Sequence, residues 1–333
     1  MSTIKTPYLP DPGLVAAVEV ALDLQMPLLV TGEPGTGKTQ LAYWVAQQKL
    51  AEQAYGGHAT EVLRFNTKTT SVAKDLFYRY DAIRHFRDAQ RRDNAGTHIN
   101  PLDYVTFEAL GKAILAQGVQ RYVVLVDEID KASRDFPNDV LFEFEEMAFR
   151  IAEAAAGDFA EANKRPGFWS DKAGLDSQEI PKVLAEQGVI RWTAPQPKPV
   201  LILTSNSEKN LPDAFMRRCV YYHIDFPEKE QLANILEAHF PEKMALAARE
   251  HLAARFLQVR NKGLRKLPAT AELVRWVEIA EKRKIDWATV EQAEGKTSDA
   301  RSEAEKSALR TLLATYAVLT KNKDDRDKMM PKV

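Results

Sequence analysis

The segment GEPGTGKT at residues 32–39 constrains this chain more than any other part of its sequence. It follows an apolar segment, 27–31, and precedes a segment with helical spacing, 38–54. A strand, a glycine-rich turn and a helix in this order are typical of a phosphate loop, because glycines let backbone N–H groups turn toward phosphate and the helix start adds positive potential. The predicted phosphate-binding residues are Gly32, Glu33, Pro34, Gly35, Thr36, Gly37, Lys38 and Thr39.

Lys38 and Thr39 have distinct expected roles in this loop. The Lys38 ammonium is expected to contact the β- and γ-phosphates of a nucleotide, and the Thr39 hydroxyl to be a ligand of Mg²⁺.

Short apolar segments recur through the first two-thirds of the chain. Two of them are apolar at successive positions, as in strands that are buried on both faces of a parallel sheet. Helical patterns separate several of these segments, so we expect an α/β fold with a parallel five-stranded sheet and right-handed crossovers. The expected strands are 27–31, 61–66, 122–126, 200–204 and 220–224, and the expected helices are 38–54, 107–117 and 135–150.

The pattern changes near Pro227. Beyond it, four segments show apolar spacing of three to four residues, so we expect an α/β domain at 1–227 and a helical lid domain at 228–333, ending in a solvated charged tail from 321. Residues 151–199 lie where a short connection would suffice, which predicts an exposed insertion that is dispensable for folding. Within it, residues 188–193 are expected to form one arm of a hairpin.

Polar residues follow two of the expected buried strands. Asp127 and Glu128 follow 122–126, and Asn206 follows 200–204. Ligands collect at the carboxyl ends of strands in open α/β sheets. We therefore expect Asp127 to hold Mg²⁺, Glu128 to deprotonate the attacking water, and the Asn206 amide to lie between the γ-phosphate and that water.

Arg217 and Arg218 end a short expected helix just before the fifth strand. Taken alone, they are typical of a solvated basic pair. If this helix end faces a neighbouring subunit, one of them would act as an arginine finger that stabilises charge on the γ-phosphate.

Together these segments resemble the AAA+ ATPases over residues 7–290. GEPGTGKT resembles Walker A, VVLVDEID resembles Walker B, TSN resembles sensor 1, and LPDAFMRRC resembles the arginine-finger helix. The loop form and the segment after Walker B resemble the MoxR-like branch. The resemblance implies ATP and Mg²⁺ as cofactors, ATP hydrolysis, and a hexameric ring that remodels or activates a partner, often one with a von Willebrand factor A domain.

The resemblance also bears on two arginine positions. It makes Arg218, directly before Cys219, the first choice for the finger and Arg217 the second. The family's sensor 2 is usually an arginine that opens a lid helix, and here Ala269 stands in that place. Lys266 or Arg265, just upstream, are the candidates to replace it.

Charge and composition limit the alternatives. The 333 residues contain 46 Lys+Arg and 47 Asp+Glu, so the net charge of −1 gives no general attraction to nucleic acid or to an anionic membrane. One cysteine excludes an internal disulfide and favours the cytoplasm, and the sequence has no apolar run long enough for membrane insertion.

Apart from a P-loop small-molecule kinase, in which Asn206 and the Arg217–Arg218 pair would have no role, three other functions compete with protein remodelling. One is an AAA+ ATPase that acts on nucleic acid, like a clamp loader or a restriction translocase. Another is a nucleotide-controlled switch without turnover, which Glu128 disfavours. The third is a GTPase, because residues 322–325 read NKDD, but that motif lies far from Lys38 and in a helical region.

Overall fold

The computed structural model describes residues 7–50, 61–92, 99–175, 188–206, 210–241 and 244–329. The chain forms two compact units. The first consists mainly of Pro10–Gly32 and Gly37–Ile224, and the second mainly of Glu33–Thr36 and Asp225–Val333. The main change of unit therefore falls close to the boundary expected near Pro227, whereas part of the phosphate loop groups with the second unit.

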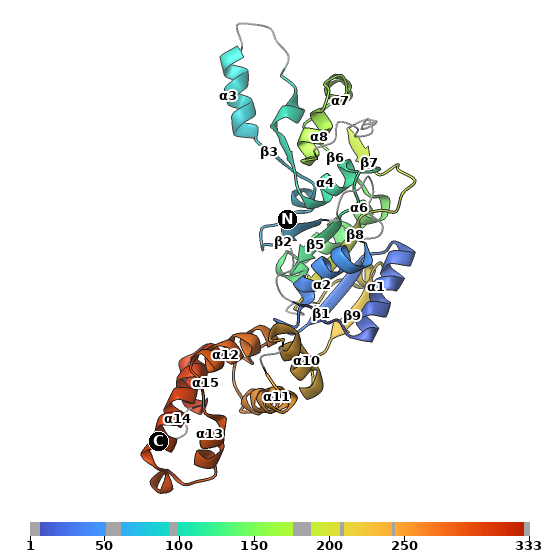
Figure 1. Ribbon diagram of the computed structural model, residues 1–333. Coiled ribbons are helices and arrows are strands. Elements are labelled where there is room, and N and C mark those ends of the chain that lie inside the picture. Colours follow the sequence, from blue (N-terminus) through green and yellow to red (C-terminus); the bar gives the residue numbers. More distant parts are fainter. Residues whose placement is uncertain are drawn as a thin grey trace. The chain divides into compact units, whose positions relative to one another are not determined.

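A five-stranded sheet forms the centre of the first unit (Figure 1). Its order is β2-β5-β8-β1-β9, and all neighbouring strands are parallel. The expected fold class, α/β with a parallel five-stranded sheet and a helical C-terminal region, is confirmed. The strands are β1 (Leu28–Gly32), β2 (Val62–Asn66), β5 (Val123–Asp127), β8 (Val200–Ser205) and β9 (Val220–Ile224).

Burial along each strand follows its place in the sheet. Every residue of β1, β5 and β8 is buried, as expected for central strands that helices cover on both faces. The edge strands β2 and β9 are only partly buried. Because β8 pairs with β1 on one side and β5 on the other, the three strands that precede Lys38, Glu128 and Asn206 are adjacent.

Helices of the first unit pack against this sheet. α1 (Pro12–Leu24) contacts β1 and β9, and α4 (Ala109–Leu115) contacts β2 and β5. α2 (Lys38–Trp44) contacts β1, β5 and β8, and continues as a π-helix, Val45–Lys49. The expected helix 135–150 is instead α5 (Phe136–Asp139), α6 (Leu141–Glu146) and a strand, β6 (Ala148–Arg150). A left-handed Met147 ends α6 and explains the break.

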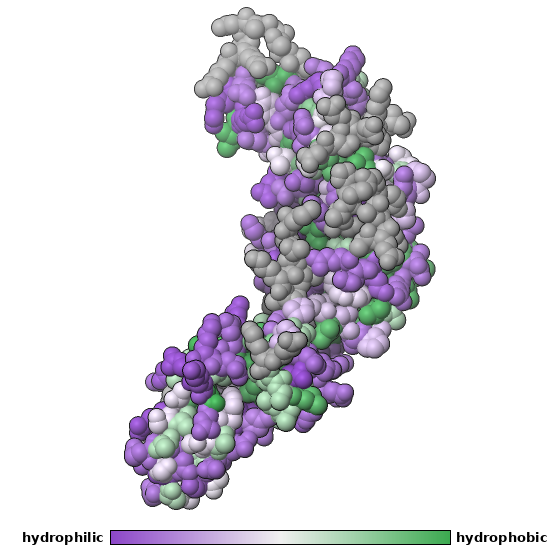
Figure 2. All heavy atoms as spheres, in the orientation of Figure 1, coloured by the Kyte–Doolittle hydropathy of each residue, from purple (hydrophilic) through white to green (hydrophobic). Residues whose placement is uncertain are grey.

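A small antiparallel pair lies between β2 and β5 in the sequence. β3 (Tyr78–Tyr80) pairs with β4 (Val105–Phe107), and α3 (Ala82–Arg92) connects to β3. The expected helix 107–117 therefore begins two residues late, after β4. The visible face of the protein is mainly hydrophilic, with small apolar areas (Figure 2). Ile83 and Phe86 of α3 are among the most exposed large apolar side chains.

The described parts of the insertion, 151–175 and 188–199, contribute to the core, contrary to the expectation that the insertion is an exposed loop. β7 (Val189–Arg191) lies within the expected arm 188–193, but its antiparallel partner is β6, which precedes the insertion, so the pair is not a hairpin within it. α7 (Ala156–Ala162) and α8 (Phe168–Ala173) place Phe159 and Trp169 in the main apolar core of the first unit. Their rings stack with centroids 6.0 Å apart. Widely spaced aromatic residues contribute this core without a regular pattern in the sequence.

The second unit is helical and has its own core around Phe256 and Trp276. Residues 321–329, the described part of the expected tail, are not fully solvated, because Asp325 and Met329 of the last helix are buried. Asn322 Nδ2 donates to Asp325, and Asp325 N donates back to Asn322 Oδ1, so this part of the NKDD motif forms a helix start. The helices are α10 (Lys229–His239), α11 (Leu246–Arg260), α12 (Thr270–Lys282), α13 (Trp287–Glu294), α14 (Glu303–Thr315) and α15 (Lys323–Met329).

Short 3₁₀ turns complete the described structure, at Ala73–Leu76, Pro101–Tyr104, Ile129–Lys131, Ser298–Ala300 and Tyr316–Val318, and a one-turn helix, α9 (Asp213–Met216), precedes β9. Among the described residues, no helix is both long enough and apolar enough to cross a membrane.

Candidate active site

The phosphate loop turns sharply at its glycines. Gly35 and Gly37 have φ of +79° and +93°, a region that residues with a side chain rarely occupy. α2 begins directly afterwards, at Lys38. Successive N–H groups in such a turn, together with those of the helix start, form a concave surface that binds anions. The local backbone therefore has the form that the sequence motif predicts.

The Lys38 side chain is buried and folds back over the loop. Its Nζ donates to the carbonyl oxygen of Gly32 over 2.7 Å. Burying an ammonium group is costly unless polar groups surround it. The protein thus holds a full positive charge beside the backbone turn, where phosphate oxygens would compensate it.

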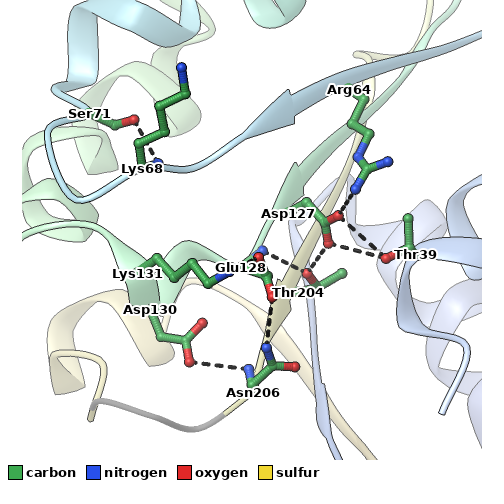
Figure 3. A network of polar contacts seen from close by, with 10 residues as sticks. All are labelled: Thr39, Arg64, Lys68, Ser71, Asp127, Glu128, Asp130, Lys131, Thr204 and Asn206. Atoms are coloured by element: carbon green, nitrogen blue, oxygen red, sulfur yellow. Dashed lines mark hydrogen bonds and ion pairs between the residues drawn. The ribbon is translucent and has the colours of Figure 1, made fainter. Parts of the chain in front are cut away.

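Asp127 is the centre of a polar cluster at the carboxyl end of the sheet (Figure 3). Its Oδ1 accepts hydrogen bonds from Thr204 Oγ1 over 2.6 Å and from Thr39 Oγ1 over 3.2 Å. Its Oδ2 forms an ion pair with Nη2 of Arg64, on β2. The carboxylate is therefore bonded from three elements, α2, β8 and β2.

Thr39 and Asp127 fit a magnesium ion by the chemistry of their donors. Mg²⁺ prefers oxygen ligands and is usually held by one or two carboxylates or hydroxyls together with phosphate oxygens and water. A threonine hydroxyl and a buried carboxylate, 3.2 Å apart beside the phosphate loop, are such a set. The structure brings together the two residues that the sequence predicts as metal ligands.

Glu128 follows Asp127 in a left-handed conformation, with φ of +57°. Its backbone N–H donates to Thr204 Oγ1 over 2.8 Å. Its carboxylate accepts a hydrogen bond from Nδ2 of Asn206 over 3.0 Å and forms an ion pair with Lys131 (Figure 3). An uncommon backbone conformation that several hydrogen bonds maintain is typical of a functional site. Here it directs a carboxylate toward the end of β8.

Asn206 is fixed by a second contact. Its backbone N–H donates to Oδ2 of Asp130 over 3.2 Å. Asp130 belongs to the 3₁₀ turn that follows Glu128, so the ends of β5 and β8 are tied together twice. This arrangement positions the Asn206 amide beside the carboxylate that we expect to act as a base.

The two arginines after α9 differ in their contacts. Arg218 pairs with Glu145 through Nε, and its Nη1 donates to the carbonyl oxygen of Ala214 over 3.0 Å. The exposed Arg217 side chain makes no polar contact within the described part of the chain. Two contacts thus hold the Arg218 guanidinium in one orientation, while Arg217 is not held.

Glu33 and Gly35 of the loop contact residues of the second unit. Oε2 of Glu33 pairs with Nη2 of Arg260, a buried arginine at the end of α11, over 2.6 Å. The guanidinium of Arg260 also lies over the Phe226 ring, 3.4 Å from its centroid. Thr270 Oγ1 donates to the carbonyl oxygen of Gly35. The carboxylate of Glu33 is therefore bound to an arginine that the sequence does not single out.

Ala269 and Lys266 lie in different surroundings. A Cβ added to Gly35 would collide with the Ala269 side chain, so the residue that replaces the family's arginine packs against the loop itself. The backbone N–H of Lys266 donates to Asp325 over 3.1 Å, and the Lys266 side chain is exposed. Arg265 pairs with Asp324 over 2.9 Å.

Around Asp127 and Glu128 the structure adds three residues that the sequence did not identify, Arg64, Lys131 and Thr204. Within the second unit it adds Arg260 as the partner of Glu33. Thr204 stands within the TSN segment, where only Asn206 was assigned a role. Arg64 had one detectable signal, since it is a charged residue between apolar neighbours in the middle of a strand. Lys131 and Arg260 had none, because many lysines and arginines of the chain lie in helices and turns.

Comparisons with known proteins give only distant similarity. The sequence matches no protein-family model and no curated protein. Two solved RuvB variants from Thermotoga maritima are 17% and 16% identical, cover 94% and 92% of this chain and 69% and 67% of theirs, and have TM-scores of 0.42 and 0.43. A structure concerned with katanin self-assembly is 12% identical, covers 97% of this chain and 87% of its own, and has a TM-score of 0.38. Because the similarity is this low, the function has to be inferred from the residues of the site.

Proposed function

We propose that this protein is an AAA+ ATPase that hydrolyses ATP to ADP and phosphate. The observation that carries the proposal is the placement of Glu128. Its carboxylate is oriented by the Asn206 amide at 3.0 Å, next to an Asp127 carboxylate that bonds Thr39 of the phosphate loop. A site that only bound nucleotide would have no need of an oriented carboxylate beside the metal ligands.

Each residue has a chemical task in the proposed reaction. Backbone N–H groups of the loop and the Lys38 ammonium bind the β- and γ-phosphates, and Thr39 and Asp127 hold Mg²⁺. The metal neutralises charge on the phosphates. Glu128 accepts a proton from the attacking water, and Asn206 holds Glu128 and that water in line with the γ-phosphate.

The proposal extends to assembly. We infer that the active form is a ring, a hexamer by its resemblance to MoxR-like proteins, in which Arg218 reaches the nucleotide of the next subunit. The contacts of Arg218 with Glu145 and Ala214 support this, since a preorganised guanidinium loses less entropy when it binds phosphate. The ring would act in the cytoplasm and remodel a partner protein, such as one with a von Willebrand factor A domain.

Two variants test the proposed activity. Lys38→Ala should lose nucleotide affinity, measured with a fluorescent ATP analogue, and with it phosphate release. Glu128→Gln should bind ATP and release little phosphate. Because the Glu128→Gln protein would remain loaded with ATP, it is also the form in which to capture the target by affinity purification. Wild-type protein that binds nucleotide but releases no phosphate, alone or with candidate partners, would contradict the assignment as an ATPase.

A further inference from the structure

Arg64 lies where its charge acts directly on the proposed metal ligand. Along β2, Asn66 is opposite Asp127 of β5, and Arg64 is opposite Leu125. Residues two apart on a strand share one face, so Arg64 and Asn66 lie on the same face, and the Arg64 side chain runs along β2 to the carboxylate of Asp127 (Figure 3).

The ion pair with Arg64 compensates the buried negative charge of Asp127. The side chain of Asp127 is 8% exposed, and an ionised carboxylate at that depth is destabilising unless an opposite charge and hydrogen bonds compensate it. Thr39 and Thr204 give it hydrogen bonds but no charge. Arg64 places a positive charge beside the Asp127 carboxylate and so compensates its negative charge, as a bound metal ion would.

The Arg64 side chain can also move away from Asp127 into solvent. Its side chain is 43% exposed, and β2 is an edge strand of the sheet. A guanidinium that swings from Asp127 into water keeps its charge solvated and breaks no strand pairing. The ion pair of Arg64 uses Oδ2 of Asp127, an atom that also lies 3.4 Å from the Thr39 hydroxyl. Arg64 and a metal ion held by Thr39 and Asp127 would therefore compete for one carboxylate.

We propose that Arg64 is a built-in counter-cation of Asp127, which Mg²⁺ displaces when it arrives with nucleotide, and that Arg64 thereby sets how strongly nucleotide binding depends on the metal. This rests on the proposed nucleotide site. Arg64 is a positioning residue here, because it acts on phosphate and metal through Asp127.

The proposal makes opposite predictions with and without metal. Without Mg²⁺, Arg64 screens the Asp127 charge from the nucleotide phosphates, so Arg64→Met should weaken binding of a fluorescent ATP analogue in EDTA by roughly tenfold. With Mg²⁺, the same variant should bind equally well or more tightly, because the metal no longer competes with a guanidinium. The ratio of the two dissociation constants, EDTA over Mg²⁺, should therefore rise by roughly tenfold or more.

Four further variants separate this role from a structural one. Arg64→Lys keeps the charge and should keep a ratio close to that of the wild type, and Arg64→Gln, which preserves polarity, should behave like Arg64→Met. In an Asp127→Asn background, Arg64→Met should leave the ratio unchanged. Arg79→Met is the matched control, since Arg79 is an exposed arginine of the first unit that pairs with Glu108 over 2.8 Å, away from Asp127.

A second measurement needs no nucleotide. In EDTA, Arg64→Met should lower the melting temperature by leaving Asp127 without its counter-charge, and adding Asp127→Asn should restore it. An unchanged EDTA-to-Mg²⁺ ratio in Arg64→Met and Arg64→Gln, or an equal change in Arg79→Met, would overturn the role of Arg64. Failure of the wild type to bind nucleotide in either buffer would instead overturn the proposed site.

Discussion

Nδ2 of Asn206 lies 3.0 Å from Oε1 of Glu128, although 78 positions separate the two residues in the chain. They are brought together because β8 pairs directly with β5, and parallel strands end at the same edge of a sheet. Thr204 reinforces the contact by binding both the Glu128 N–H and the Asp127 carboxylate. The proposed base and the residue that orients it therefore each directly follow one strand of a paired set, β5 and β8.

This geometry predicts different kinetic effects for the two residues. Glu128→Gln should lower kcat for ATP hydrolysis by ~10²–10⁴, because the variant lacks a base. Asn206→Ala keeps the base but loses its orientation, so its kcat should fall by up to about 10²-fold. The affinity for nucleotide should change little in both, and phosphate release with parallel binding measurements checks this.

The double variant supplies the control. If Asn206 acts through Glu128, combining Asn206→Ala with Glu128→Gln should cost little more activity than Glu128→Gln alone. Losses that multiply would show that Asn206 acts on the nucleotide or water independently of Glu128.

The insertion provides a prediction about stability. Phe159 is 1% exposed and stacks on Trp169, so Phe159→Ala should lower the free energy of unfolding by about 3–5 kcal/mol. Phe142→Ala is the control, since Phe142 is 63% exposed on α6 and its loss should change the free energy by less than about 0.5 kcal/mol. Denaturant unfolding measures both effects. Equal midpoints for Phe159→Ala and wild type would show that Phe159 does not contribute to the core and would support the expectation of an exposed loop.

Sequence patterns were most informative where local chemistry determines structure. All five sheet strands lie within one residue of the expected positions. The three central strands are mainly apolar because both of their faces are buried, and one of them leads into the phosphate loop. The insertion was misjudged because its aromatic residues are widely spaced, and nothing in their spacing shows which core they join. The tail was misjudged for the same reason, since Asp325 is buried by bonding the backbone of Arg265 and Lys266, 59 or more positions away.

The residues of the site likewise fall into a group that the sequence predicts and a group that it does not. Lys38, Thr39, Asp127, Glu128 and Asn206 could be found because each lies at or soon after the end of a strand, and strand ends form the ligand-binding edge. Arg64 lies inside a strand, and its role depends on β2 lying next to β5, which the sequence does not determine. Arg260 depends on a contact with Glu33, 227 positions away.

The single cysteine gives a prediction about pH. Burial raises the pKa of the Cys219 thiol to about 12. At pH 8 the folded protein should therefore react with iodoacetamide about 10³-fold more slowly than the unfolded chain, whose thiol has a pKa of about 8.5. The raised pKa also means that folding favours the protonated thiol, so this group's contribution to stability is lost as the pH rises from about 9 toward 12.

The pH profile of labelling distinguishes this from simple steric shielding. In the folded protein the rate should keep rising about tenfold per pH unit between pH 8 and 10, because the thiolate fraction is still small. Cys219 is the only cysteine, so labelling reports on it alone. A rate that levels off near pH 9 would show an ordinary thiol.

The arginines after α9 give a prediction about assembly. Arg218→Ala should keep its affinity for ATP and lose about 10³-fold or more in turnover, because only Lys38 and Mg²⁺ would remain to neutralise charge on the neighbour's γ-phosphate as it leaves. Arg217→Ala is the matched control, since it removes the same charge one position earlier and should retain most activity. Loss of turnover in Arg217→Ala alone would transfer the finger to Arg217.

Mixing subunits tests whether Arg218 acts in the next subunit. Arg218→Ala subunits have an intact nucleotide site but no finger to offer, whereas Lys38→Ala subunits offer a finger but bind no nucleotide. A mixed ring contains interfaces where an intact Lys38 site meets an intact Arg218, so activity should return although neither variant is active alone. Subunit exchange is verified first with differently labelled proteins. If exchanged rings remain inactive while wild-type subunits diluted with Lys38→Ala retain activity, Arg218 acts within its own chain, since that dilution shows that the ring tolerates dead sites.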